Sequence, residues 1–305
     1  MMRYLPQWSL TRRKIFTNCA RRFALQYFNR DKTKMFRTKS LQFIAHHDLM
    51  IKCTRIVFFE LLSDLHKGVT WSDKLIISKM RFQINIHTSA KANTKLGLNK
   101  KNLLIRNGYL RLKKLMKQEI PRKILDNSIK EWSFYERIKS TKFGHLDVYC
   151  SPDIVYRENS VWHLVRLNFQ SEHKQPFLDL ELCSMLLWSQ GNQYLPNLAE
   201  KFVIHGLSFL KGKWFYKKIR PNQKLLQETK QLLEKDVHNF NILFEKLYRN
   251  GDYDALPLAK SSLYCKRCPY KVNCPINLES SRSKLSSQVI KNRINISSFG
   301  NTTSK

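Results

Sequence analysis

Four cysteines near the two ends of the chain constrain its fold more than any other feature. Three of them, Cys265, Cys268 and Cys274, follow a C-x2-C-x5-C spacing. Two residues between thiols allow a tight chelating turn, so these side chains can reach one metal centre. Such a centre usually needs four ligands, and Cys19 is the candidate fourth. The fourth ligand would then come from the opposite end of the chain.

Thiolate ligands suit tetrahedral zinc or an iron–sulfur cluster. Pro269 and Pro275 directly follow two of the cysteines, as prolines do in bacterial ferredoxin runs, and this favours iron–sulfur over zinc. The plain alternative is three chance cysteines in a basic tail. The remaining Cys53, Cys150 and Cys183 stand in apolar surroundings and are interpreted as core residues.

The charge balance favours a polyanionic partner. The 305 residues hold 55 Lys and Arg against 23 Asp and Glu, a formal charge of +32. Such a charge repels itself unless a polyanion neutralises it. Nucleic acid is the commonest partner of this kind, and an anionic membrane is the main competitor. Because no apolar run reaches the roughly 18 residues of a membrane span, we expect no membrane partner.

Cysteine usage bears on the compartment. Seven cysteines, several of them at metal spacing, favour a reducing interior, cytoplasm or nucleoid, over a disulfide framework. No signal-peptide pattern is present. The first thirty residues hold several arginines and no acidic residue, so an organelle transit peptide is the alternative. Such peptides are rich in serine, and Ser9 stands alone there.

Hydrophobic periodicity divides the chain into a helical part and a strand-rich part, with a change of texture after Pro121. Ser9 is a credible N-cap for the first helix, which carries Cys19, and Gly68 ends the second. Residues 29–40 are expected to form a loop. We expect helices at residues 9–28, 41–65, 72–84, 99–118, 177–188 and 221–249. We expect largely antiparallel strands at residues 132–136, 144–150, 153–156, 161–167, 202–209 and 213–219.

Four features follow one another in the chain. They are Cys19-Ala20-Arg21-Arg22-Phe23, a helical insert, Gly144-x-x-Asp147 in a hairpin, and the C-terminal C-x2-C-x5-C. This order resembles the iron–sulfur branch of the PD-(D/E)XK nucleases. That branch includes nuclease domains of AddB type, CRISPR-associated exonucleases with RecB-like domains, and mitochondrial exonuclease V. The resemblance runs from residue 9 to 275. It implies an α/β fold with a mixed sheet flanked by helices.

The resemblance also implies a cofactor and a domain plan. Cys19, Cys265, Cys268 and Cys274 would bind a 4Fe-4S cluster that staples the chain ends together over the core. If this link acts as a disulfide does, it removes roughly 5 kcal/mol of unfolded-chain freedom. The expected domain covers residues 1–278, with a helical insert at about 66–120 and a sheet core at about 130–220. A disordered basic tail is predicted at 279–305.

The catalytic pattern of this family is not matched. Two-metal phosphodiester cleavage needs carboxylates that hold Mg²⁺ and a lysine beside the attacking water. The family supplies a helix histidine, a hairpin aspartate, a (D/E)-x-K on the next strand and a Q-x3-Y. Here Phe59 stands for the histidine, Arg166-Leu167-Asn168 stands for (D/E)-x-K, and Q-x3-Y is missing. Asp147 is the only retained position, and one carboxylate holds Mg²⁺ poorly. Pairing with Arg166 is an equally good interpretation of this aspartate.

We therefore expect a catalytically degenerate nuclease fold that binds DNA, single-stranded DNA in particular. Such a protein would serve as a DNA-binding or scaffolding subunit in DNA processing or repair, beside a helicase or nuclease partner. The lysines of residues 213–218 enclose three aromatic residues, Trp214, Phe215 and Tyr216, which are candidates to stack on unpaired bases. The candidate phosphate contacts are Arg21, Arg22, Lys213, Lys217 and Lys218.

Two alternatives remain open. The first is an active, Mg²⁺-dependent single-strand DNA exonuclease with a diverged site, in which Asp153, Glu172 or Asp179 supplies the missing carboxylate. The second is a zinc-stapled structural protein of a basic ribonucleoprotein.

Overall fold

The computed structural model describes residues 7–28, 46–89, 96–135, 137, 139–170, 175–250, 253, 256–259, 261–265, 268–270 and 274. The chain divides into two compact units. The larger unit comprises Met1–Leu10 and Phe43–Asn239, and the smaller unit comprises Thr11–Gln42 and Phe240–Lys305. The single domain expected over residues 1–278 stays a prediction. The expected loop at 29–40 and tail at 279–305 lie outside the described residues.

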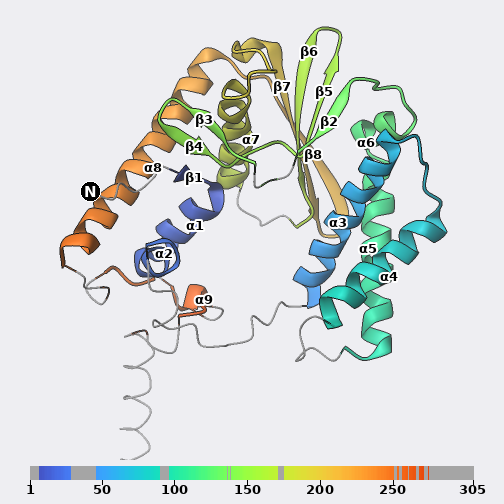
Figure 1. Ribbon diagram of the computed structural model, residues 1–305, viewed down its shortest axis with the longest axis horizontal. Helices are drawn as coiled ribbons and strands as arrows, with labels where there is room; N and C mark the ends of the chain where they lie inside the picture. The colour runs from blue at the N-terminus through green and yellow to red at the C-terminus, as the bar shows by residue number, and fades with distance from the viewer. Residues whose placement is uncertain are drawn as a thin grey trace, which may run out of the picture. The chain divides into compact units, whose positions relative to one another are not determined.

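A five-stranded mixed sheet forms the centre of the larger unit (Figure 1). Its strands, in spatial order, are β2 (Trp132–Phe134), β5 (Ile154–Glu158), β6 (Val161–Asn168), β7 (Phe202–Leu210) and β8 (Lys213–Ile219). Only β6 and β7 run parallel, and α7 (Gln175–Gln190) makes the crossover between them. The β5–β6 and β7–β8 hairpins turn through two residues with positive φ, which matches the right-handed twist of the strands.

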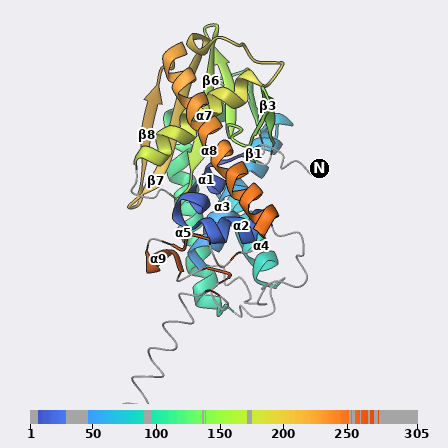
Figure 2. The ribbon, with the colours of Figure 1, turned by 90° about the vertical axis from the view of Figure 1, so that its left-hand side faces the viewer.

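A three-stranded sheet adds β1 (Gln7–Trp8), β4 (Leu146–Val148) and β3 (Thr141–Phe143), in that spatial order. Gly144, at φ +58°, turns the chain from β3 into β4, so the predicted hairpin at Gly144–Asp147 is present. It belongs, however, to this smaller sheet. Helix α7 packs against both sheets (Figure 2). The fold is therefore a mixed α/β arrangement with two mixed sheets flanked by helices.

Helices α3 (His46–His66), α4 (Asp73–Ser89), α5 (Leu98–Met116) and α6 (Glu119–Leu125) form the helical part of the larger unit. Gly108 lets α5 approach its neighbours closely, because a Cβ there would clash with Met80 and lie 2.9 Å from the Thr54 hydroxyl oxygen. The leucines of α5 do not all face the core. Leu103 and Leu110 are 55% and 41% exposed, so they point away from the core. The buried leucines of this helix are Leu104, Leu112 and Leu115.

The smaller unit contains most of α1 (Leu10–Asn18), α2 (Ala20–Tyr27), the end of α8 (Gln223–Asn250) and α9 (Ser262–Cys265). The single helix expected over residues 9–28 is wrong, because the backbone at Cys19 is extended (φ −163°, ψ 103°) and separates α1 from α2. Phe23 packs on Phe240 at 4.6 Å between ring centroids, and Phe28 on Phe244 at 5.2 Å. These rings give the unit its own apolar core. No helix within the described ranges has the length and apolarity needed to cross a membrane.

Candidate functional site

A buried carboxylate surrounded by arginines lies beside β5. The Asp153 side chain is 0% exposed. Arg137 donates to both of its oxygens, from Nε to Oδ1 at 3.0 Å and from Nη2 to Oδ2 at 2.9 Å. Arg55 Nη2 donates to Oδ1 at 3.3 Å, and Arg166 Nη1 to Oδ2 at 3.3 Å. The backbone N–H of Leu167 donates to Oδ2 at 2.7 Å, so five donors converge on one carboxylate.

The strand register explains why these residues meet. Ile154 pairs with Val165 across the β5–β6 hairpin, and the Asp153 N–H continues the ladder by donating to the Val165 carbonyl at 2.8 Å. Asp153 therefore lies beside Arg166 and Leu167 on β6. Arg55 reaches the same place from α3, and Arg137 reaches it from the segment after β2, where its Nη2 also donates to the Leu167 carbonyl at 2.6 Å.

Arg166 joins this aspartate to a second carboxylate. Its side chain is buried, with Nε 3.1 Å from Oε1 of Glu181 on α7 and Nη2 3.4 Å from the Cys150 sulfur. Three guanidinium groups thus share two carboxylates, which leaves the cluster with one net positive charge. A buried ion pair survives only with good geometry and satisfied hydrogen bonds. Both Asp153 oxygens meet these conditions, whereas Arg166 Nε has only the ion pair with Glu181 and makes no hydrogen bond within the described residues.

The pKa shifts follow from this arrangement. Burial alone raises the pKa of the Asp153 carboxyl, but the charges of Arg137, Arg166 and Arg55 outweigh burial and hold it well below its usual range. Burial alone lowers the pKa of Arg166, and the charges of Asp153 and Glu181 reverse this and raise it. Burial, with the neighbouring charge of Arg137, lowers the pKa of Arg55 to about 10. Arg55 and Arg166 therefore stay charged near neutral pH, and Asp153 stays ionised.

This carboxylate is poorly suited to hold a metal ion. Mg²⁺ needs anionic oxygens with free lone pairs in octahedral geometry. Both oxygens of Asp153 already accept several hydrogen bonds, and three cations surround them. Arg166-Leu167-Asn168, the segment expected at the place of (D/E)-x-K, lies beside Asp153, and Arg166 is a counter-ion of this aspartate.

Asp147 lies elsewhere. It is on β4, where its Cα pairs with Gln7 in parallel and Lys142 in antiparallel register, in the three-stranded sheet. The predicted pairing of Asp147 with Arg166 is wrong, because Arg166 pairs with Asp153 and Glu181. Of the other acids considered, Asp179 forms an ion pair with Lys217, and residue 172 lies outside the described residues.

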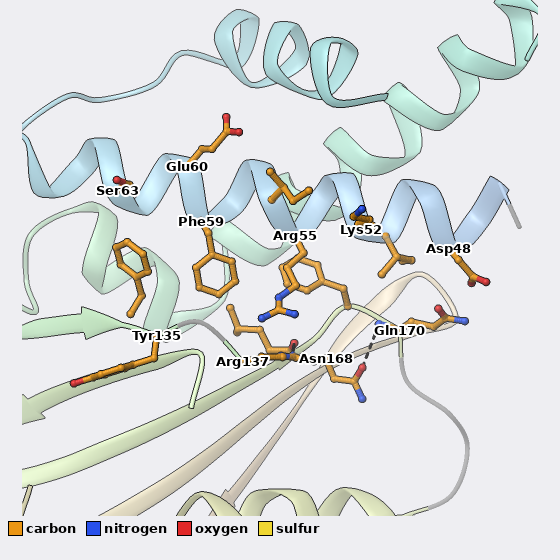
Figure 3. Close-up of a pocket in the computed structure, with 15 residues that line it drawn as sticks. Asp48, Lys52, Arg55, Phe59, Glu60, Ser63, Tyr135, Arg137, Asn168 and Gln170 are labelled. Carbon is orange, nitrogen blue, oxygen red and sulfur yellow. Dashed lines mark hydrogen bonds between the residues drawn. The ribbon is translucent and has the colours of Figure 1, made fainter. Parts of the chain in front are cut away.

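An open cavity of about 740 Å³ lies between α3 and the β6 end of the sheet. Figure 3 shows Arg55 extending from α3 towards Arg137, with Phe59 pointing into the same space. The guanidinium carbon of Arg55 lies 5.3 Å from the centre of the Phe59 ring. The polar or charged lining residues are Asp48, Lys52, Arg55, Glu60, Ser63, Tyr135, Arg137, Asn168 and Gln170, and the apolar ones are Ile51, Ile56, Phe59, Phe134, Leu167 and Phe169.

The four cysteines at metal spacing all belong to the smaller unit. Cys19 caps the N-terminus of α2, and its sulfur accepts the Arg22 N–H at 3.4 Å. Burial raises the pKa of the Cys19 thiol, the Arg22 N–H opposes this, and the charges of Cys268 and Cys274 raise it further. Burial also raises the pKa of the Cys268 thiol, and the charges of Cys265 and Cys274 raise it further. Cys268 is therefore within electrostatic reach of the other three thiols.

Hydrogen bonds within the smaller unit bring the chain ends together. The Arg21 N–H donates to the Pro257 carbonyl at 3.4 Å, its Nη1 donates to the Tyr253 carbonyl at 2.7 Å, and the Tyr270 hydroxyl donates to the Leu25 carbonyl at 3.5 Å. Among the residues that the structure describes, no three His, Cys, Asp or Glu side chains are close enough to hold a metal ion. Thiolates are the donor type that zinc and iron–sulfur centres use.

The predicted phosphate contacts differ in their surroundings. Arg21 is buried, and its guanidinium is engaged by Tyr253, so it is not accessible to a phosphate. Arg22 is half-buried in the same unit. On β8, Lys213 and Lys218 are exposed, whereas Lys217 is paired with Asp179.

Of the aromatic residues on β8, two are accessible. Trp214 is buried, with Nε1 donating to the Arg111 carbonyl at 3.2 Å, so the prediction that it stacks on bases is wrong. Phe215 and Tyr216 are about half exposed. They follow each other on one strand and therefore face opposite sides of the sheet.

Sequence reasoning missed a histidine network on the same sheet. His163 Nδ1 lies 2.8 Å from His205 Nε2, and His205 Nδ1 lies 2.7 Å from the Tyr216 hydroxyl. Tyr156 stacks on His163 at 4.3 Å between ring centroids. Burial, with the nearby His163, lowers the pKa of His205 to about 3. The register of four adjacent strands, β5 to β8, creates this network, and no local motif marks it.

No protein-family model matches the sequence, and none of the curated proteins is significantly similar to it. The function is therefore inferred from the site and the charge of the chain.

Proposed function

We propose that this chain is a nucleic-acid-binding protein with a nuclease-like fold, in which arginines have taken the place of the metal-binding residues. One observation carries the proposal. The only fully buried carboxylate at the β5–β6 hairpin among the described residues, that of Asp153, is closed by three guanidinium groups and a backbone N–H. A site of this charge favours phosphate over a divalent cation.

The arrangement supports a relationship to the PD-(D/E)XK nucleases and also the loss of their chemistry. The family carries an aspartate in a hairpin and (D/E)-x-K on the next strand. In the β5–β6 hairpin, Asp153 corresponds to the first, and Arg166-Leu167-Asn168 corresponds to the second. Arg166 stands where the family has an acidic metal ligand, and Asn168 stands where it has the lysine beside the attacking water. These two replacements would remove both groups.

The charge of the chain supports nucleic acid as the partner. A formal charge of +32 remains after the acidic residues are counted. Contacts of such basic side chains with phosphate supply most of the sequence-independent affinity for nucleic acid. We propose single-stranded DNA as the ligand, bound as part of DNA processing beside a helicase or an active nuclease. The exposed Phe215 and Lys218 on β8 are compatible with stacking and phosphate contacts along a strand.

We further propose that Cys19, Cys265, Cys268 and Cys274 hold a 4Fe-4S cluster, with zinc as the alternative. Their proximity in the smaller unit, and the hydrogen bonds that join α2 to the C-terminal segment there, support this. When bound, the cluster would supply four strong bonds between the chain ends. Its role here would be structural, because linking residues so distant in sequence restricts the unfolded chain.

A salt titration tests the proposal. Binding of a labelled single-stranded oligonucleotide to the full-length, cofactor-loaded protein is measured by fluorescence anisotropy between 50 and 300 mM salt, about the range in which phosphate contacts weaken steeply. We expect the logarithm of the binding constant to fall linearly with the logarithm of salt concentration. Absence of binding at low salt, or binding that does not respond to salt, would contradict the proposal.

A further inference from the structure

We propose that the cavity between α3 and β6 binds a nucleoside phosphate without a metal ion, with Arg55 and Arg137 holding the phosphate. This inference rests on the proposed nucleic-acid binding and adds the ligand unit, its site and its independence of metal. The ligand chemistry is that of one phosphorylated nucleotide, either free or at the end of a strand.

The two arginines are held in place before any ligand binds. Arg137 uses Nε and Nη2 in three hydrogen bonds to Asp153 and the Leu167 carbonyl. Arg55 uses Nη2 in one bond to Asp153. Within the described part of the chain, Nη1 of Arg137 and Nε and Nη1 of Arg55 make no hydrogen bond to protein. Both side chains line the cavity and are about one-third exposed, at 34% and 30%. Planar donors fixed in this way bind phosphate at little cost in side-chain entropy.

The charges that line the cavity favour an anion. Lys52, Arg55 and Arg137 are its cationic residues, and Asp48 and Glu60 its anionic ones. Glu60 is engaged outside the phosphate position, with Oε2 3.3 Å from Lys79 Nζ and Oε1 accepting from Gln83. Asp153 is fully covered by its partners and presents no oxygen to the cavity.

The remaining walls suit a base. Phe59, Phe134 and Phe169 provide apolar surface, and the side chains of Asn168 and Gln170 provide amide donors and acceptors for base edges. In Figure 3, Phe59 and Arg55 extend from the same face of α3 into the cavity, which places an aromatic surface next to the phosphate position. A volume of 740 Å³ lies within the range of about 300–1,000 Å³ that small-molecule sites occupy.

The experiment uses the full chain in buffer with EDTA. Adenosine monophosphate, adenosine and inorganic phosphate are titrated by calorimetry. Short oligonucleotides with and without a 5′-phosphate are compared by anisotropy. We expect the monophosphate to bind at least tenfold more tightly than adenosine, and inorganic phosphate to compete with it. A gain in affinity from the 5′-phosphate would identify the strand end as the natural ligand. A monophosphate that binds with no such gain would identify the free nucleotide.

Arg55→Gln is the variant of choice, because Asp153 keeps its bonds to Arg137, Arg166 and the Leu167 N–H. Arg157→Gln is the matched control, since Arg157 is exposed on β5 and does not line the cavity. We expect Arg55→Gln to weaken monophosphate binding at least tenfold with an unchanged melting temperature, and the control to bind as the wild type does.

Three results would overturn the inference. The first is monophosphate binding that is lost in EDTA and restored by Mg²⁺. The second is Arg55→Gln binding the monophosphate as tightly as the wild type does. The third is that neither the monophosphate nor a 5′-phosphate on an oligonucleotide raises affinity, while a long single strand still binds. The last result leaves the proposed nucleic-acid binding intact, so the two failures are distinguishable. Absence of binding to the long strand as well would contradict both.

Discussion

Asp153→Asn tests the arginine cluster directly. The amide keeps the shape of the side chain but removes its charge, so the net charge of the cluster rises from one to two. Five donors face the carboxylate in the native protein. Asparagine offers one acceptor oxygen, and its NH₂ group turns a donor towards guanidinium donors. Arg166, which is buried, is then left with Glu181 as its only charge partner within the described residues.

The cost follows from the burial of the pair. Removing one partner of a buried ion pair costs about 3–5 kcal/mol, because the other charge stays buried without compensation. Domains are stable by about 5–15 kcal/mol, so the variant should lose about a fifth or more of its stability. Arg55 and Arg137 can turn partly towards solvent, which places the expected loss near the lower end, at about 3 kcal/mol.

Guanidinium chloride unfolding at pH 7, followed by tryptophan fluorescence, measures this loss as a lower midpoint with an unchanged slope. Asp147→Asn is the matched control. Asp147 is partly exposed, and its side chain makes no hydrogen bond within the described ranges, so the change should be about 0.5 kcal/mol or less. Equal midpoints for Asp153→Asn and the wild type would refute the account of the cluster. A larger loss for the control than for Asp153→Asn would do the same.

Two further predictions concern the histidine network and the cysteines. The folded-state pKa of His205 is about 3, whereas unfolded histidine titrates near 6.5, so the unfolded chain binds more protons between these values. The free energy of unfolding should therefore fall as pH drops below 6.5, by up to about 1.4 kcal/mol per pH unit. In His205→Gln the unfolding midpoint should change less between pH 7 and pH 4.5 than it does in the wild type. An equal change in the two proteins would contradict this. Cys268→Ser should lose the absorbance near 400 nm and the bound iron of anaerobically purified protein, whereas Cys183→Ala should keep both. Zinc in place of iron in the wild type would exclude the cluster.

Much of the fold could be predicted from hydrophobic periodicity. Helices α3, α4, α5, α7 and α8 and the five strands of the large sheet lie close to the expected ranges. Periodicity shows which side chains are apolar. It therefore did not predict features that depend on backbone conformation, such as the break between two helices. The break at Cys19 leaves the apolar spacing of Phe16 and Phe23 unchanged. Strands of two or three residues, such as β1 and β3, are too short to show alternation.

The site was harder to predict because its residues meet through strand pairing. The spacing from Gly144 selected Asp147, and the hairpin at that position exists. Which aspartate faces β6 depends on the register of β5 with β6, which no local motif encodes. A signal was present in Pro152-Asp153 directly before a β-rich run, since a strand that starts there places Asp153 at its N-terminal end. The arginines at 55 and 137 lie far from it in sequence and carried no such signal.

The most direct test of the central claim, that arginines have replaced the metal in this site, compares DNA binding and cleavage in Mg²⁺ and in EDTA. Cofactor-loaded, full-length protein is incubated with end-labelled single-stranded DNA under both conditions. Affinity is measured by anisotropy and strand length on a denaturing gel. We predict equal affinity in the two buffers and an intact strand after prolonged incubation. Mg²⁺-dependent shortening of the strand that is lost in Asp147→Ala or Asp153→Ala would contradict it.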